Sequence, residues 1–146
     1  MFCLFSCRFW EYNKNRQLQS SGDLNKYFNS KEAENMDAMF VWQRNRRTYV
    51  FKGSKYWRYS IGAKKFDSGY PRNIKQAWDE NFPSDISAAV SWLNDKSYIF
   101  KGDIYWRLKK DTTKIDVGYP KRIAEQWMKC NTNVEGFSVG SANEQP

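Results

Sequence analysis

Three cysteines, Cys3, Cys7 and Cys130, carry the most reactive side chains of this sequence, because thiols form disulfides and bind metals. Three is an odd number, so at least one of them lacks a partner within the chain. Cys130 is compatible with half of a disulfide, a free thiol or a metal ligand. Cys3 and Cys7 have a C-x-x-x-C spacing within a predicted hairpin, where a bond between them would strain the strands. We interpret these two cysteines as structural or adventitious.

The sequence offers few residues for catalysis. It contains no histidine, which removes the commonest general base and the commonest zinc ligand. The phosphate-binding motif G-x-x-x-x-G-K is absent. Asp79 and Glu80 are adjacent carboxylates, which do not converge as the two groups of an acid–base pair do. The sequence therefore predicts a chain that is not an enzyme and has no catalytic residues.

A basic surface favours anionic ligands. The formal net charge is +8 and the isoelectric point is about 9.4, so the surface attracts polyanions or acidic proteins. Arg44, Arg46 and Arg47 lie together at one predicted hairpin tip. They form either a solvated face or a binding site for a polyanion such as heparan sulfate, or for an acidic partner. Nucleic acid is not expected, because the aromatic residues alternate along strands as core residues do.

The cysteines and basic residues described above lie in or next to the copies of an internal sequence repeat, which therefore determines their positions in the fold. The stretch YVFKGSKYWRY at 49–59 recurs as YIFKGDIYWRL at 98–108, which is 49 residues later. A third, more divergent copy, FCLFSCRFWEY at 2–12, opens the chain at an offset of 47 from the first of these. The chain therefore holds two full copies of one unit and part of a third.

Each full copy is predicted to contain four short strands, the fourth being the weakest. Gly53-Ser54 and Gly102-Asp103 form two-residue turns between the second and third strands, with glycine where a type II′ hairpin requires a positive φ. Pro71 and Pro120 follow the fourth strand, and we place each at the first position of a short helix.

Four tryptophans recur at two places in each full copy: Trp57 matches Trp106, and Trp78 matches Trp127. Such residues can line a ligand cage, but recurrence at one place in every repeat favours packing. Trp78 and Trp127 also follow an isoleucine by four residues, which predicts a shared helix face for each pair.

A four-stranded unit of this length cannot bury both faces of its sheet alone, whereas units stacked around an axis can. The predicted fold is therefore an all-β propeller with short helices after each blade, and the hairpin recurs because each blade packs its aromatic faces on its neighbours. The stretch 131–146 is polar and without periodicity, which predicts a disordered tail.

The motifs D-A-x-F, Y-x-F-K-G-x-x-Y-W-R and G-Y-P-x-x-I, followed by a tryptophan, resemble the hemopexin-like repeat. This repeat builds four-bladed propellers in matrix metalloproteinases, hemopexin and vitronectin. The ending GYPKRIAEQWMKC is similar to the end of the fourth blade in membrane-type matrix metalloproteinases. The resemblance covers residues 2 to 130 and implies an incomplete propeller of about two and a half blades, truncated at its N-terminus. Residues 1–35 are then the remainder of blade two, 36–85 blade three and 86–130 blade four, before the tail at 131–146.

The resemblance also implies candidate site residues. Backbone carbonyls at the starts of the first strands bind calcium or sodium in the family, and the equivalent carbonyls here belong to Asp37, Met39, Ser87 and Ala89. Cys130 would form a disulfide with a cysteine of the missing first blade. Zinc would be found only in a missing catalytic domain.

The function implied by the resemblance is non-catalytic binding. The domain would dock extracellular-matrix proteins such as collagen, tissue inhibitors of metalloproteinases, or a second copy of itself, for a zinc metalloendopeptidase parent. The alternative is a vitronectin-like adhesion protein outside the protease family, or a scaffold of degenerate repeats. Haem transport is disfavoured by the absence of histidine. We expect an extracellular or cell-surface parent, although this chain shows no signal peptide or membrane span.

Overall fold

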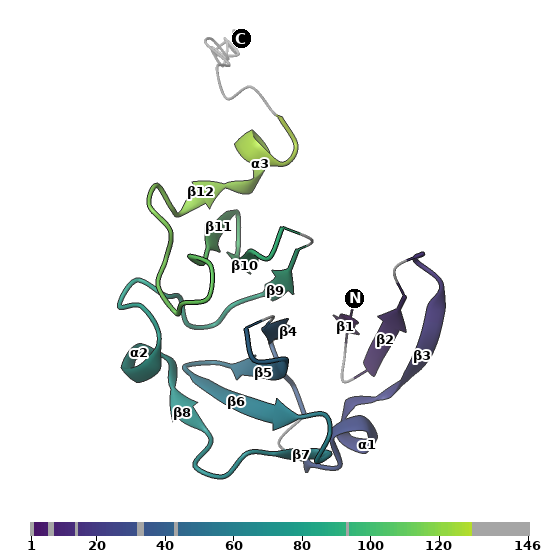
Figure 1. The fold of residues 1–146 in the computed structure, drawn as a ribbon. Coiled ribbons are helices and arrows are strands. Elements are labelled where there is room, and N and C mark those ends of the chain that lie inside the picture. The colour runs from purple at the N-terminus through teal and green to yellow at the C-terminus, as the bar shows by residue number, and fades with distance from the viewer. Residues whose placement is uncertain are drawn as a thin grey trace, which may run out of the picture.

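The computed structural model of the chain describes residues 2–5 (as backbone), 8–13, 15–31, 34–42, 44–92 and 94–129. Three antiparallel sheets follow one another along the chain, and a short helix follows each sheet (Figure 1).

The three sheets differ in their number of strands. The first comprises β1 (Phe2–Phe5), β2 (Arg8–Tyr12) and β3 (Leu18–Asp23), followed by α1 (Leu24–Phe28). The second comprises β4 (Ala38–Trp42), β5 (Arg47–Lys52), β6 (Lys55–Ser60), β7 (Lys65–Phe66) and β8 (Arg72–Asn73), followed by α2 (Ile74–Ala77). The third comprises β9 (Ala88–Ser91), β10 (Ser97–Lys101), β11 (Ile104–Arg107) and β12 (Lys121–Arg122), followed by α3 (Ile123–Gln126).

The sheets are arranged around a common centre. Their opening strands β1, β4 and β9 lie innermost, with β4 in contact with both of the others, and the later strands and helices lie outward (Figure 1). Within the second and third sheets, neighbouring strands are consecutive in the sequence up to the outer edge. This is the meandering arrangement that the repeat predicts for each blade.

The predicted hairpins are confirmed. In the second sheet Lys52 pairs with Lys55 across a turn in which Gly53 has a φ of 57°, and Gly102 has a φ of 58° at the equivalent turn of the third sheet. The predicted fourth strand is short in both sheets. It is β7 in the second sheet and a single bridge between Leu108 and Ile115 in the third.

The prediction that Pro71 and Pro120 begin the helices is wrong. Each proline follows a cis peptide bond and lies three residues before its helix. The residues between them, 72–73 and 121–122, pair as β8 and β12 with the third strand of the sheet, so each helix begins only after this pairing ends. In the second sheet Asn73 caps the helix, because its Oδ1 accepts a hydrogen bond from Lys75 N at 3.0 Å.

Apolar side chains fill the spaces between successive sheets. Along β5, Tyr49 and Phe51 face the third sheet and Val50 faces the first, as strand alternation requires. The cluster between the first and second sheets contains Phe9, Leu24, Phe28, Met39, Val50, Trp57 and Tyr59. The cluster between the second and third sheets contains Ala38, Phe40, Trp42, Tyr49, Phe51, Tyr56, Ile74, Trp78, Phe82, Ile86, Ile99, Trp106 and Leu108.

The fold is therefore mostly β, with several antiparallel sheets and a few short helices, as predicted. Closure of the sheets into a ring, the number of blades and the boundaries at residues 35, 85 and 130 stay predictions. The predicted tail at 131–146 lies outside the described residues. Across the described part of the chain, none of the helices has the length and apolar character needed to cross a bilayer.

Candidate functional site

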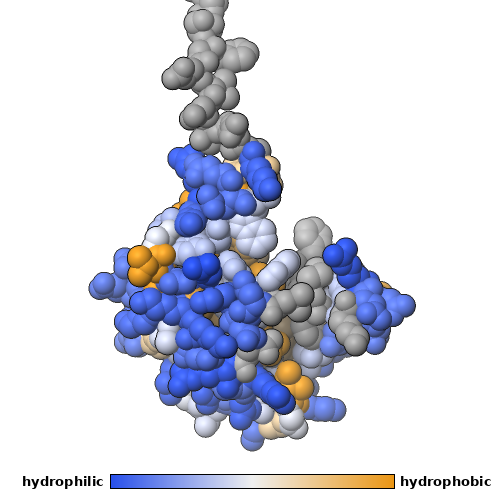
Figure 2. Space-filling view, turned by 45° about the horizontal axis from the view of Figure 1, so that its top comes forward, coloured by the Kyte–Doolittle hydropathy of each residue, from blue (hydrophilic) through white to orange (hydrophobic). Residues whose placement is uncertain are grey.

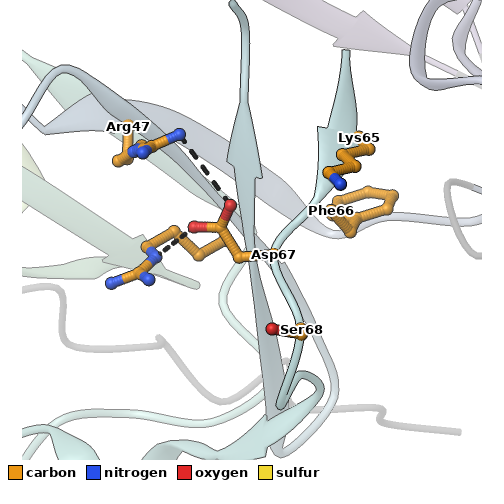
Figure 3. A pocket seen from close by; sticks show the side chains of 6 residues that line it. Arg47, Lys65, Phe66, Asp67 and Ser68 are labelled. Atoms are coloured by element: carbon orange, nitrogen blue, oxygen red, sulfur yellow. Dashed lines mark hydrogen bonds and ion pairs between the residues drawn. The ribbon is translucent and has the colours of Figure 1, made fainter. Parts of the chain in front are cut away.

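A basic pocket opens at the outer part of the second sheet. It has a volume of about 380 Å³ and is lined by Arg47, Arg58, Lys65, Phe66, Asp67 and Ser68, which we call the basic pocket (Figure 3). The first residue of β5 and the fourth residue of β6 contribute the two arginines. β7 and the residues directly after it contribute the other four. Most of the molecular face seen in Figure 2 is hydrophilic, with a few hydrophobic patches.

Asp67 is the centre of the charge arrangement in the basic pocket. Its Oδ2 accepts a hydrogen bond from Arg58 Nε at 2.5 Å, and Arg47 Nη1 lies 3.8 Å from Oδ1 (Figure 3). The hydrogen bond from Arg58 to Asp67 raises the pKa of Arg58, against a smaller opposing effect of burial. The side chain of Asp67 is 17% exposed, whereas those of Arg47 and Arg58 are 39% and 37% exposed. The cations thus present their charge to solvent around a more enclosed carboxylate.

The third sheet has cations and a carboxylate at the equivalent sequence positions, which we call the second basic cluster: Lys96, Arg107, Lys114 and Asp116. Asp116 Oδ2 lies 2.8 Å from Arg107 Nη2 and 3.9 Å from Lys96 Nζ. Burial raises the pKa of Asp116, but the hydrogen bond and the charge of Arg107 outweigh burial and lower it overall. Lys114 precedes Asp116 by two residues, as Lys65 precedes Asp67.

The first sheet carries different residues at the same place. Glu11 stands where the second sheet has Arg58, and Ser20 stands where it has Asp67. Ser20 Oγ donates a hydrogen bond to Glu11 Oε2 at 2.9 Å. The contact between the two strands is therefore kept, but the local charge is negative.

The predicted arginine tip does not hold its three side chains together. Arg44 turns toward the third sheet, where its Nη1 donates to the carbonyl of Asp111 at 2.9 Å. Arg46 is exposed in the turn with a φ of 52°. Arg47 instead faces Asp67 in the basic pocket. The sequence-based prediction does not include Arg58 and Asp67, although their nine-residue spacing recurs in the next repeat and is visible in the alignment.

The predicted calcium ligands include two carbonyls at the inner edge. The carbonyl of Val41 accepts a hydrogen bond from Ser91 Oγ at 2.6 Å, so it points from β4 toward β9. Alternate residues of a strand direct their carbonyls to the same edge, so the carbonyl of Met39 points to this inner edge as well. Ala89 has the equivalent position in β9. Carbonyl oxygens suit calcium, but calcium takes about six to eight oxygen ligands, of which these strands supply only a part.

The other two predicted ligands use their side chains locally. Asp37 Oδ2 accepts a hydrogen bond from Gly53 N at 2.6 Å, and Ser87 Oγ donates to the carbonyl of Phe100 at 3.1 Å. The predicted role of the backbone oxygens of Asp37 and Ser87 as metal ligands stays a prediction. Among the residues that the structure describes, no three acidic or cysteine side chains converge as a metal site.

The recurring tryptophans are packing residues in three of four positions. Trp57, Trp78 and Trp106 are buried, and Trp78 is surrounded by rings such as Phe82, whose centroid lies 4.7 Å away. Trp127 is exposed on the outer face of the third sheet, where it contacts the rings of its own sheet.

The cysteine predictions are largely outside the described residues. Cys7 and Cys130 are not described, and for Cys3 the structure describes the backbone, which pairs with Trp10 in the β1–β2 ladder. The disulfide of Cys130 stays a prediction.

Comparison with known proteins identifies the repeats. The family model described as Hemopexin matches residues 36–80 and 86–130. Matrix metalloproteinase-25 of Mus musculus is 39% identical over 72 residues, which are 49% of this chain and 11% of that protein. The human protein of the same name is 34% identical over 84 residues, 58% of this chain and 15% of that protein. Human vitronectin is 44% identical over 45 residues, 31% of this chain and 9% of that protein. The chain thus spans a small part of each of these relatives.

Solved structures agree on the fold. A hemopexin fold protein from cow pea has a TM-score of 0.68 and 21% identity, covering 87% of this chain and 64% of that chain. A seed protein from Dolichos, described as a 2S albumin, also has a TM-score of 0.68, with 22% identity, and covers 87% of this chain and 65% of that chain. At this level of identity the likeness concerns the fold alone.

Proposed function

The chain belongs to the hemopexin family, and on this premise we propose that it is a protein-interaction domain that docks extracellular-matrix proteins or protease inhibitors. The family domain is non-catalytic, and the matches to the metalloproteinases fall within it. The parent would be an extracellular or cell-surface zinc metalloendopeptidase, and this part would bring substrates such as collagen to it, or bind tissue inhibitors of metalloproteinases.

The observation that supports binding is that residues common to both full repeats pack between the sheets, whereas residues that differ between the repeats lie at exposed turns. The aromatic residues that both repeats share lie mainly between sheets, where they hold the fold together. The turn tips differ: Arg46 and Asp95 hold equivalent positions with φ values of 52° and 59°, but their charges are opposite. A rigid stack of sheets that varies its exposed tips can select a partner through rim charges and loop side chains.

The test is direct binding of the full chain to immobilised fibrillar collagen and to tissue inhibitors of metalloproteinases, with serum albumin as the negative surface. We expect saturable binding to at least one of the matrix or inhibitor surfaces. The matched variants Arg46→Asp and Lys64→Asp reverse the charge at two exposed turn positions with similar φ values of 52° and 50°. Unequal effects of the two variants would locate the contact. Absence of saturable binding to every matrix and inhibitor surface would refute the proposal.

The match to vitronectin supports a second candidate, a cell-adhesion module outside the protease family. Attachment of cells to a surface coated with the chain, without binding to the inhibitors, would favour this second candidate.

A further inference from the structure

We propose that the basic pocket and the second basic cluster bind sulfate groups of an acidic polysaccharide. This inference does not depend on the proposed docking of proteins. It rests on the geometry of the cations, on the mixed charged and apolar lining of the basic pocket and on the recurrence of the arginine–aspartate contact in the next repeat.

The first step is the balance of charge. The basic pocket is lined by three cations and a single carboxylate, which leaves two positive charges uncompensated. Arg58 donates a hydrogen bond to Asp67, whereas Arg47 Nη1 lies 3.8 Å from Asp67 Oδ1, an ion-pair distance that is too long for a hydrogen bond. Among the described residues Arg47 has no second ion pair, so its guanidinium can also bind an anion. Lys65 is exposed, and it forms no ion pair among the described residues. A sulfate oxygen can therefore be bound by Arg47 and Lys65 without breaking the contact between Arg58 and Asp67.

The second step is that the fold does not need this excess of positive charge. Asp67 N already donates to the carbonyl of Arg58 at 2.8 Å, which ties the two segments through the backbone. In the first sheet the equivalent tie is made by Ser20 and the negatively charged Glu11. The second and third sheets have an arginine and a lysine at the positions where the first sheet has Glu11 and Leu18.

The third step is the shape of the site. A volume of about 380 Å³ is at the lower end of the range for small-ligand pockets and suits a single charged sugar unit. Phe66 supplies an apolar wall next to the cations, and Ser68 supplies a hydroxyl group (Figure 3). A sulfated sugar presents both an anionic group and an apolar ring face, and thus matches both parts of the lining.

The fourth step is that a similar group of charged residues recurs in the next repeat, which favours a polymeric anion as the ligand. Arg107 and Lys96 lie 2.8 Å and 3.9 Å from Asp116 in the third sheet, as Arg58 and Arg47 contact Asp67 in the second. Lys114 holds the sequence position that corresponds to Lys65. Two equivalent sites on one rigid frame gain affinity for a ligand whose anionic groups repeat along a chain, because the second contact becomes intramolecular. A sulfated polysaccharide has this property, whereas a short acidic peptide does not repeat its charges in the same way.

The experiment compares two pairs of substitutions in the full chain. Arg47→Gln with Lys65→Gln removes the two available cations of the basic pocket and keeps the Arg58–Asp67 contact. Arg46→Asn with Lys64→Asn removes the same charge at the neighbouring positions, both exposed and outside the basic pocket, and asparagine tolerates their positive φ. Titration with fluorescent heparin would measure affinity, and thermal melts would confirm that each variant is folded.

We expect the pocket pair to bind heparin about tenfold more weakly and the control pair to bind it less than about twofold more weakly, because site-specific charge contacts exceed general attraction. Desulfated heparin, which keeps its carboxylates, should bind poorly even to the unchanged chain. Equal losses in both pairs would overturn the proposal in favour of non-specific attraction. Equal binding of desulfated heparin, or full displacement by polyglutamate, would assign the site to carboxylates of an acidic protein instead. If the pocket pair fails to fold, Lys65→Gln alone against Lys64→Asn alone gives the same comparison at exposed positions.

Discussion

Trp78 and Trp127 occupy equivalent positions in consecutive repeats, but Trp78 is 5% exposed and Trp127 is 43% exposed. Each follows a short helix, and each donates its backbone N–H to the isoleucine carbonyl four residues earlier, at 2.9 Å in both cases. The difference arises from what covers them. The third sheet lies over Trp78, whereas among the described residues no sheet lies over Trp127.

The two tryptophans therefore predict unequal losses of stability. Trp78→Ala removes a side chain from the centre of the aromatic cluster and should lower the free energy of unfolding by about 3–5 kcal/mol. Trp127→Ala should cost only about 1–2 kcal/mol, since 43% of this residue stays exposed to water when the chain is folded. Urea unfolding of both variants measures the difference. Equal losses would mean that the outer face of the third sheet is covered in solution.

The hairpin turn geometry predicts that alanine substitutions at two glycines have different effects on stability. Gly53 has a φ of 57°, so Gly53→Ala places a β-carbon in a strained conformation and should destabilise the protein by about 1–2 kcal/mol. Gly62→Ala is the matched control, because Gly62 lies outside the positive φ range and a β-carbon there meets no atom within 4 Å. Gly62→Ala should be neutral or slightly stabilising. Thermal melts would decide, and a neutral Gly53→Ala would contradict the turn geometry.

Asp79 predicts a dependence of stability on pH. Burial raises the pKa of Asp79, but hydrogen bonds from the N–H groups of Asn81 and Ile115 outweigh burial and lower it overall. A carboxyl group with a lowered pKa in the folded state stabilises the fold above its unfolded pKa of about 3.9. This contribution is lost as the pH falls through the lower, folded value.

The measurement is unfolding in urea between neutral pH and acid. Asp79→Asn should reduce stability at neutral pH and weaken the further loss below about pH 4, whereas Glu80→Gln, at the exposed neighbouring position, should leave both unchanged. A pH profile of Asp79→Asn that parallels the unchanged chain would show that other carboxylates control acid unfolding.

Calcium is the subject of a fourth prediction. We propose that the inward carbonyls of Met39 and Ala89 contribute to a calcium site at the centre of the sheets. Calcium bound only to the folded state should raise the melting temperature, by about 4 °C for each 1 kcal/mol gained. Melts in calcium, in magnesium and in a chelator would measure it. Identical melting in calcium and in chelator would rule the site out for this chain.

Much of each repeat could be predicted from the sequence, because its signals are local. The alternation in YVFKGSKYWRY and the glycine between its halves specify a hairpin, and β5 and β6 form it with the expected register. The outer edge could not be predicted so well. β7 is only two residues long, and the pairing of β8 with β6 depends on contacts that lie far apart in sequence.

The basic pocket illustrates why a site is harder to predict than a hairpin. Arg44, Arg46 and Arg47 are close in sequence and suggest a cluster, but the three side chains turn to different partners. Arg47 meets Asp67 because β5, β6 and the segment after β7 lie side by side, which is a property of the folded sheet. Sequence proximity indicates the region, and strand pairing decides which side chains converge.

The segment that joins the second and third sheets is itself part of the core. Phe82 and Ile86 are fully enclosed between the sheets, and the backbone N–H of Asp79 donates to the carbonyl of Thr113 at 3.1 Å. In many repeat proteins the linker between two repeats is the site at which a repeat can be removed, duplicated or exchanged. Here a boundary placed within this linker would remove core residues from between the second and third sheets. Chimeras that exchange one repeat for another should therefore keep the linker together with both of these sheets.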